Sequence, residues 1–303
     1  MELSKILENL YQKFLSKRTK DTGEQFILWI ALVSFIIHLV IIGLLHFNLI
    51  TINIQSNLLK NPIAAIYTPF SFILVYEVYL LIYYLPKSTS TYISKQYEII
   101  ALIIIRRLFK DLSDLSLSTN WFNIKNDLQF TYDLVASVIL FYLIYLFHIQ
   151  RTKVYRTVIN NENHSLSISK FINAKKWIAT ALVPTLLLIA LYSFFSWSVG
   201  VFESSDTHHI SFKNINNIFF EQFFTILIIA DVIILLFSFF HTDEFHKVIR
   251  NSGFIISTIL IRISFSVSGV INNLLIVSAI LFGLIMLFIH NKFEKKLAEE
   301  SEE

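Results

Sequence analysis

Eight runs of predominantly apolar residues restrict what this chain can fold into. Each is near the length of about twenty residues that a helix needs to cross the hydrocarbon core of a bilayer. Helices and closed barrels alone satisfy every backbone hydrogen bond inside a membrane, and runs of this length fit helices. We therefore expect an all-α, polytopic membrane protein whose eight spans lie at roughly 26–47, 63–85, 94–109, 129–149, 177–198, 218–240, 251–267 and 272–291.

The composition supports this class and argues against others. The chain is 55% hydrophobic and only 16% charged, whereas soluble domains are about 25% charged. It has no cysteine, which excludes disulfides, iron–sulfur clusters and thiolate zinc sites. Neither a glycine-rich phosphate loop, a nucleophile elbow nor an HExxH motif occurs. We predict no enzymatic activity, no cofactor and no binding of nucleic acid.

Possible metal ligands lie close together in the segments "HTDEFH" (241–246) and "DTHH" (206–209). The two histidines of the first segment are five residues apart, a spacing that suits a metal site poorly. Thr242 and Asp243 are better suited to cap the helix that follows. We therefore expect no metal site in this segment.

The distribution of Lys and Arg predicts the orientation, because cytoplasmic loops are enriched in both. With the N-terminus inside, eighteen of the 25 basic residues fall in cytoplasmic segments. The outside loops hold only four, at Lys60, Lys110, Lys125 and Lys213. We expect a multi-pass protein of the cytoplasmic (inner) cell membrane with both termini in the cytoplasm.

The remaining basic residues lie inside spans and indicate an internal repeat. The segment "YEVYLLIYY" matches "ADVIILLFS", which aligns Glu77 with Asp231. About thirty residues later "IIRRLF" matches "ILIRIS", which aligns Arg107 with Arg262.

The first and last helices of each half agree as well. Residues 136–147 and 277–288 share eight of twelve positions, and Trp29 and Trp177 both begin a Trp-Ile-Ala sequence. Four spans in each half insert both halves in the same sense. The chain is thus expected to be two parallel four-helix repeats related by a pseudo-twofold axis along the membrane normal.

These features divide the chain into five segments. Apolar residues recur at helical spacing near the N-terminus and predict an amphipathic helix on the membrane surface or beneath the bundle. That helix and the basic linker are candidate surfaces for anionic lipid. The segments are an N-terminal cytoplasmic region (1–24), the first repeat (25–150), the linker (151–176), the second repeat (177–291) and a charged cytoplasmic tail (292–303).

Both halves carry an acid midway along the second helix, a short basic loop and an apolar third helix that ends at Arg107-Leu108 or Arg262-Ile263. An outside loop and a Ser-containing apolar fourth helix follow in each half. This pattern resembles the four-span, phosphate-starvation-inducible PsiE-like membrane proteins. The resemblance covers helices two to four of each half and implies the architecture of a tandem PsiE-like protein, with little about its chemistry. Glu77/Asp231 and Arg107/Arg262 would then be the family's recurrent charged positions.

The sequence departs from that pattern in two places. A family Asp ahead of the fourth helix falls near Asp133, one residue out of register, and Asn273 stands there in the second half. Arg106 has no counterpart, because Ile261 occupies its position in the second half.

The charged residues within the spans are the candidate functional site. A charge at the centre of a membrane helix costs about 2.5–3.5 kcal/mol, so we predict that Glu77 pairs with Arg107 and Asp231 with Arg262. Arg106 lies about 100° further round its helix. It either extends toward the outer interface near Lys110 and Asp111 or pairs with Asp133.

Two functions fit such pairs. They form a gate or relay for an ion, a proton or a small solute, because intramembrane ionisable residues commonly mark such routes. Alternatively, they hold together a non-transporting component of a stress-response or regulatory complex. The expected partners are the bilayer and either further copies of the chain or another protein.

Overall fold

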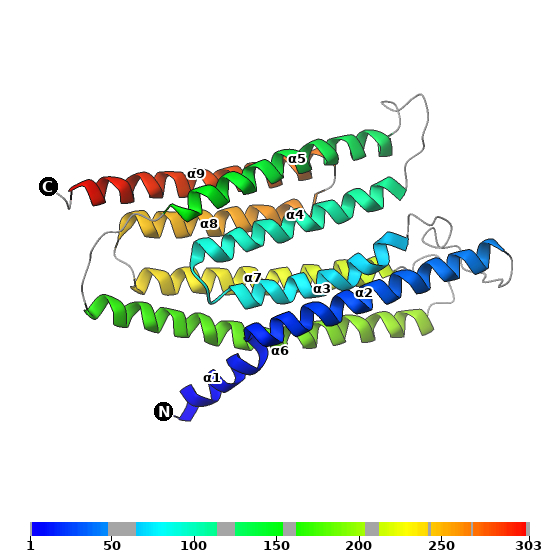
Figure 1. Cartoon of the computed structure of the whole chain (residues 1–303), viewed down its shortest axis with the longest axis horizontal. Helices are drawn as coiled ribbons and strands as arrows, with labels where there is room; N and C mark the ends of the chain where they lie inside the picture. The colour runs from blue at the N-terminus through cyan, green and yellow to red at the C-terminus, as the bar shows by residue number, and fades with distance from the viewer. Residues whose placement is uncertain are drawn as a thin grey trace. The chain divides into compact units, whose positions relative to one another are not determined.

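The computed structural model describes residues 2–47, 65–113, 125–153, 162–203, 212–241, 244–267 and 269–300. Of these residues 94% are helical and none is in a strand, which agrees with the expected all-α class. Figure 1 shows the helices in chain order. They are α1 (Glu2–Leu15), α2 (Lys17–His46), α3 (Tyr67–Tyr84), α4 (Thr89–Ser113), α5 (Lys125–Thr152), α6 (Glu162–Glu203), α7 (Phe212–His241), α8 (Phe245–Ser264) and α9 (Val270–Glu300).

The N-terminal ends of α2 and α8 differ in how they are capped. Ser16 separates α1 from α2, and its Oγ accepts a hydrogen bond of 3.2 Å from the backbone N–H of Thr19, as helix N-caps do. Glu244 occupies the N-cap of α8 without a side-chain cap. The predicted capping residues Thr242 and Asp243 lie outside the described residues, and the cap belongs to Glu244 instead. Helix α6 begins at Glu162, so the second part of the predicted linker is helical.

Five helices in the described part of the chain are long and apolar enough to cross a membrane. They lie at Lys5–His46, Leu128–Thr152, Ser169–Ile189, Gln222–Phe240 and Val270–Glu300, and Thr68–Tyr84 is a shorter apolar helix. Helices α4 and α8 overlap the predicted third and seventh spans, which charged residues interrupt. These apolar helices indicate a membrane protein.

The surface of the described chain is unusually apolar, and its interior holds polar as well as apolar side chains. Large apolar side chains face outward along α2, where Trp29 is 67% exposed. The interior of the described chain includes polar side chains, among them Asp231, Ser257 and Asn272, each at most 2% exposed. Water does not favour such a surface, whereas lipid does.

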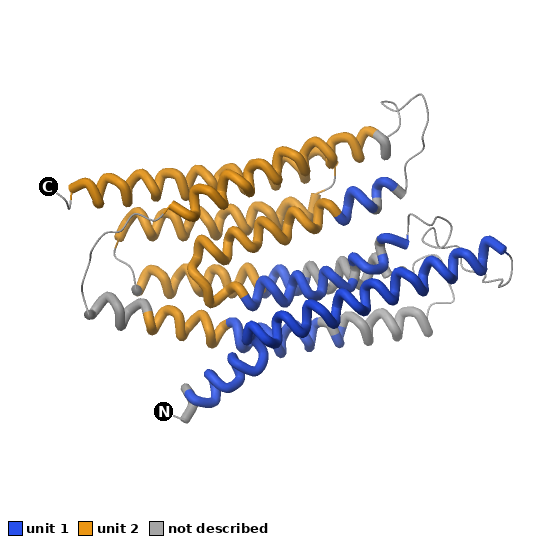
Figure 2. Tube along the Cα trace, viewed as in Figure 1, with its two compact units in different colours: residues 1–83, 106–116, 179–226 blue, residues 84–105, 117–178, 227–303 orange. Residues whose placement is uncertain are grey.

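The described chain divides into two compact units (Figure 2). The first comprises residues 1–83, 106–116 and 179–226, and the second comprises 84–105, 117–178 and 227–303. Each unit therefore contains segments from both halves of the sequence. In the first unit, the hydroxyl of Tyr79 on α3 donates 2.8 Å to the carbonyl oxygen of Phe14 and so holds the end of α1.

In the second unit, α9 packs against both α8 and α5. Two contacts join α5 and α9, and the residues that make them are almost equally spaced, 17 residues apart on α5 and 18 on α9. Asn273 donates to the carboxylate of Asp133, and Asn291 donates 2.8 Å to the carbonyl oxygen of Gln150. These two helices therefore run parallel and in register.

Tyr97 on α4 fills the space that a glycine on α9 leaves open. Its hydroxyl lies 2.7 Å from Ser257 Oγ, and Ser257 in turn donates 2.6 Å to the carbonyl oxygen of Ala279. A Cβ atom at Gly283 would overlap the Tyr97 hydroxyl oxygen. The close packing of α4, α8 and α9 thus requires glycine at this position.

We expect Gly283→Ala to lower the stability of the purified protein by about 1–3 kcal/mol, because overpacking displaces a buried ring. The matched control is Gly43→Ala on α2, where an added Cβ has no neighbour within 4 Å. That change should be neutral or stabilise the helix by up to about 1 kcal/mol. Thermal unfolding in detergent measures both, and equal midpoints for the two variants would contradict this packing.

Candidate functional site

Asp231 lies on the part of α7 that belongs to the second unit, and it is only 1% exposed. Apolar neighbours flank it along the helix, in the sequence "IIADVIILL". A carboxylate in such surroundings is costly unless charged or polar groups satisfy it. Its neighbours therefore decide what the site can do.

Three side chains donate hydrogen bonds to this carboxylate. The Tyr92 hydroxyl lies 2.8 Å from Oδ1. Arg262 Nη2 and Gln96 Nε2 lie 3.3 Å and 3.4 Å from Oδ2. The predicted contact between Asp231 and Arg262 is formed. Tyr92 and Gln96 come from α4 in the first half of the sequence, and Arg262 comes from α8 in the second.

Lys175 adds a second positive charge that acts on Asp231. It lies on α6, is 2% exposed, and its Nζ donates 3.0 Å to the carbonyl oxygen of Lys87. The site therefore combines one acidic and two basic side chains with neutral donors. We call Asp231, Arg262, Tyr92, Gln96 and Lys175 the Asp231 cluster.

Sequence reasoning missed three members of this cluster. Tyr92 and Gln96 are four residues apart, which places them on one face of a helix, and this spacing was the available signal. Lys175 counted among the basic residues of the cytoplasmic linker, where nothing in the sequence distinguishes a buried lysine from an exposed one.

Glu77 on α3 is also buried, at 6% exposed. The arginine whose charge acts on it is Arg106, not the predicted Arg107. Adjacent helical residues point about 100° apart, so one of the two faces Glu77 better than the other. Arg106 is also one residue closer to Glu77 in expected depth. The prediction therefore identified the correct helix, α4, but chose Arg107 where the charge that acts on Glu77 belongs to the preceding residue, Arg106.

Asp133 on α5 is fully buried. It accepts hydrogen bonds from Asn273 on α9 and, at 2.7 Å, from Gln129 on its own helix. Asp133 and Asn273, which are one residue out of register between the proposed halves, thus contact each other. Both amides donate to Oδ1, so these neutral donors cover one of the two carboxylate oxygens without adding a second charge.

Comparison with known proteins finds no match to a family model, a curated protein or a solved structure. The resemblance to the PsiE-like proteins therefore stays a prediction from the residues.

The geometry of the Asp231 cluster predicts a non-additive response to substitution. We expect Asp231→Asn or Arg262→Gln alone to destabilise the protein by about 3–5 kcal/mol, because each leaves a buried charge without its partner. The double variant removes both charges and should recover a large part of that loss. The midpoint of thermal unfolding in detergent, measured for all four proteins, tests the coupling.

A matched cycle uses Lys295 and Glu299, an exposed pair 3.4 Å apart, whose neutralisation should cost about 0–1 kcal/mol. Simple addition of the two single effects in the Asp231–Arg262 cycle would contradict the buried pair.

Proposed function

We propose that the chain is an ion-conducting membrane protein in which the Asp231 cluster acts as a charged gate. The observation that carries this proposal is a buried carboxylate held jointly by donors from α4 and α8. Residues from the two halves of the sequence meet at one ionised site, and parallel-repeat transporters place their sites between such halves.

The proposal includes eight spans in two parallel repeats. Helix α4 has 25 residues and α8 has 20, which gives lengths of roughly 37 Å and 30 Å against a core of about 30 Å. The buried face of α8 carries polar residues such as Asn251 and Thr258, while Ile256 and Ile263 on the other side are 48% and 51% exposed. This pattern suits a helix that crosses the bilayer with its polar side inward.

The in-register contact of α5 with α9 supports the repeat. Gln150 and Asn291 are 141 residues apart and touch, and the same offset relates the matching segments that begin at residues 136 and 277. Equivalent residues of two parallel units meet where a twofold axis passes between them.

The charges of the Asp231 cluster favour anions among possible ions. Arg262 and Lys175 together outweigh the single carboxylate of Asp231 by one positive charge. Basic side chains line anion pathways, whereas acidic ones line cation pathways. In the conformation described, the carboxylate of Asp231 pairs with Arg262. In the proposed mechanism this pairing is the closed state of the gate.

One observation favours the second candidate function, a non-transporting membrane component. Both oxygens of Asp231 accept hydrogen bonds and the residue is almost fully buried. Such a site can fix the arrangement of three helices without conducting anything. In that case α1, with Ile6 and Leu10 exposed at 57% and 40%, and the basic linker are the surfaces for anionic lipid or a protein partner.

The proposed location is the cytoplasmic (inner) membrane with both termini in the cytoplasm, as part of a PsiE-like stress response. Eight spans place the two termini on the same side, whereas the five apolar helices alone would place them on opposite sides. The natural chain has no cysteine, so single cysteines report position cleanly. We expect Lys5→Cys and Lys296→Cys to be labelled by a membrane-impermeant maleimide only after the cells are opened.

A further pair of cysteines tests whether α4 crosses. Eight spans predict that Lys110→Cys is labelled in intact cells and that Lys87→Cys is not. Labelling of both from the same side would show that α4 stays on one side, and the eight-span arrangement would be wrong.

Flux into liposomes tests the gate. We expect the wild-type protein to pass chloride faster than potassium. Asp231→Asn should raise the chloride flux, because it frees Arg262, and Arg262→Gln should lower it. Asp21→Asn, a change of the same chemistry at an exposed residue, is the control and should leave the flux unchanged. A well-folded wild-type protein that passes neither ion at any pH or potential would favour the non-transporting function.

A further inference from the structure

A second polar cluster lies where α8 begins and α9 ends. His246 comes from the first turn of α8, while His290 and Glu294 are four residues apart on one face of α9. The side chains of all three are largely buried, at 9%, 8% and 12% exposed. Along the sequence, the histidine near His246 is His241, and two histidines five residues apart suit a metal site poorly. The fold instead brings His246 to two possible ligands from another helix.

The donor atoms of this cluster converge on one point. His246 Nε2 lies 2.9 Å and His290 Nε2 lies 3.8 Å from Glu294 Oε1, and the three donor atoms lie within 4.8 Å of one another. Four ligands arranged tetrahedrally around Zn²⁺ at 2.0–2.2 Å have donor atoms about 3.4 Å apart. The observed separations bracket that value. Glu244 Oε2, which is 3.3 Å from His246 Nε2, is in reach as a fourth donor.

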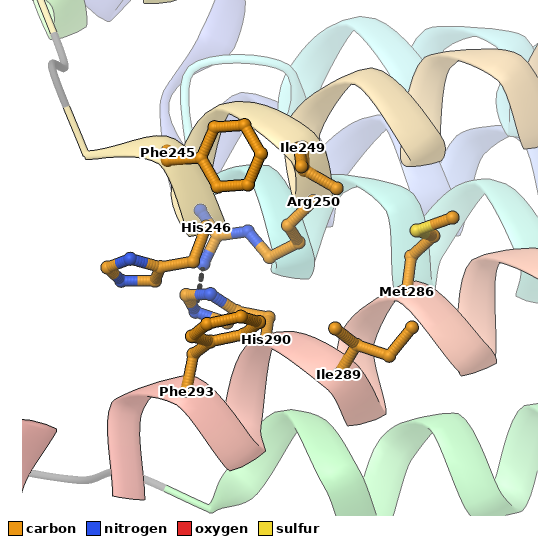
Figure 3. A pocket seen from close by; sticks show the side chains of 8 residues that line it. All are labelled: Phe245, His246, Ile249, Arg250, Met286, Ile289, His290 and Phe293. Atoms are coloured by element: carbon orange, nitrogen blue, oxygen red, sulfur yellow. Dashed lines mark hydrogen bonds between the residues drawn. The ribbon is translucent and has the colours of Figure 1, made fainter. Parts of the chain in front are cut away.

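Arg250 holds the place that the metal would take. Its Nη1 donates 2.7 Å to His290 Nε2, as the dashed line in Figure 3 shows. That hydrogen bond uses the lone pair of His290 that coordination also needs. Arg250 has another acceptor, Asn251 Oδ1, at 3.2 Å and 3.0 Å from its Nε and Nη2, so it can leave His290 and still be held by Asn251.

The charge of Arg250 makes this a competition between two cations. A guanidinium keeps its proton in proteins, and the carboxylates of Glu294 and Glu244 act on it here. Arg250 is therefore charged at neutral pH. Because a metal ion and a guanidinium repel each other across one imidazole, either one or the other occupies His290.

A small cavity adjoins the cluster. His246, Arg250 and His290 line it together with the apolar side chains of Phe245, Ile249 and Met286, and its volume is about 30 Å³. This is enough for a water-sized guest, which needs at least about 10–15 Å³. Figure 3 shows His246, Arg250 and His290 meeting at the side of this space. The cavity borders the two imidazoles but is not lined by Glu294, so it gives His246 and His290 room to move and is not itself the ion site.

We propose that His246, His290 and Glu294 bind a divalent ion of the zinc class, with Glu244 or water as the fourth ligand and Arg250 as the group displaced. Two imidazoles and a carboxylate form the ligand set that Zn²⁺ prefers, and they suit Mg²⁺ and Ca²⁺ poorly. The bound ion cross-links the start of α8 to the end of α9. This site is independent of any conduction through the Asp231 cluster.

If Arg250 and the metal ion compete for His290, removing Arg250 should strengthen metal binding. A purely structural role of these residues does not predict that result. Zn²⁺ binding is measured by calorimetry on the full-length protein in detergent, carrying a tag without histidine. We expect one equivalent to bind to the wild type and His290→Gln or Glu294→Gln to weaken that binding by about 10–100-fold or more. Arg250→Gln, which removes the competing cation, should instead tighten it. Co²⁺ should give the intense visible bands of a four-coordinate ion, and Mg²⁺ should not bind.

The matched control is His208→Gln/His209→Gln, a histidine pair elsewhere in the chain, which should leave the affinity unchanged. Where His290→Gln fails to fold, His246→Gln removes a ligand from the first turn of α8 instead. If neither the wild type nor Arg250→Gln binds Zn²⁺ at about 100 µM, the proposal is overturned. Binding that survives the loss of His246 and of Glu294 would overturn it equally.

Discussion

The burial of charged and polar side chains inside an apolar exterior governs this structure. An unpaired charge in such surroundings costs several kcal/mol, so each buried ionisable group must sit where another helix brings donors or acceptors. Asp231 therefore ties α7 to α4 and α8, and Asp133 ties α5 to α9. Between apolar helices in lipid, hydrophobic burial does not choose the partner or the register. These polar contacts make that choice.

Helix α8 joins the two sites. His246 stands in its first turn and Arg262 in its last, sixteen residues apart, which is roughly 24 Å along the helix axis. Between them, Asn251 donates to Ser238 on α7 and Ser257 donates to the carbonyl oxygen of Ala279 on α9. These two hydrogen bonds hold α8 against its neighbours over the length that separates the proposed metal site from the Asp231 cluster.

The sequence was sufficient for the helical class and for the Asp231–Arg262 contact, because long apolar runs and matching depths in a hairpin depend on local spacing. It failed where the answer depends on rotation about a helix axis. Arg106 and Arg107 differ by one residue in depth and by about 100° in direction, and the apolar context gave no sign of which faces Glu77. It also missed contacts across many residues, such as His246 with Glu294, since no spacing along the chain encodes them.

The contact between Asp133 and Asn273 has a consequence for the tandem repeat that we propose. If two identical units met here as a homodimer, nearly equivalent residues would face each other near the symmetry axis, because Asp133 and Asn273 are one position out of register between the proposed halves. Two aspartates there would repel, and one would have to carry a proton. Fusion into a single chain removes that restriction, because each half can then be altered separately. An amide in one half can face a carboxylate in the other, an asymmetric solution that a symmetric dimer cannot encode.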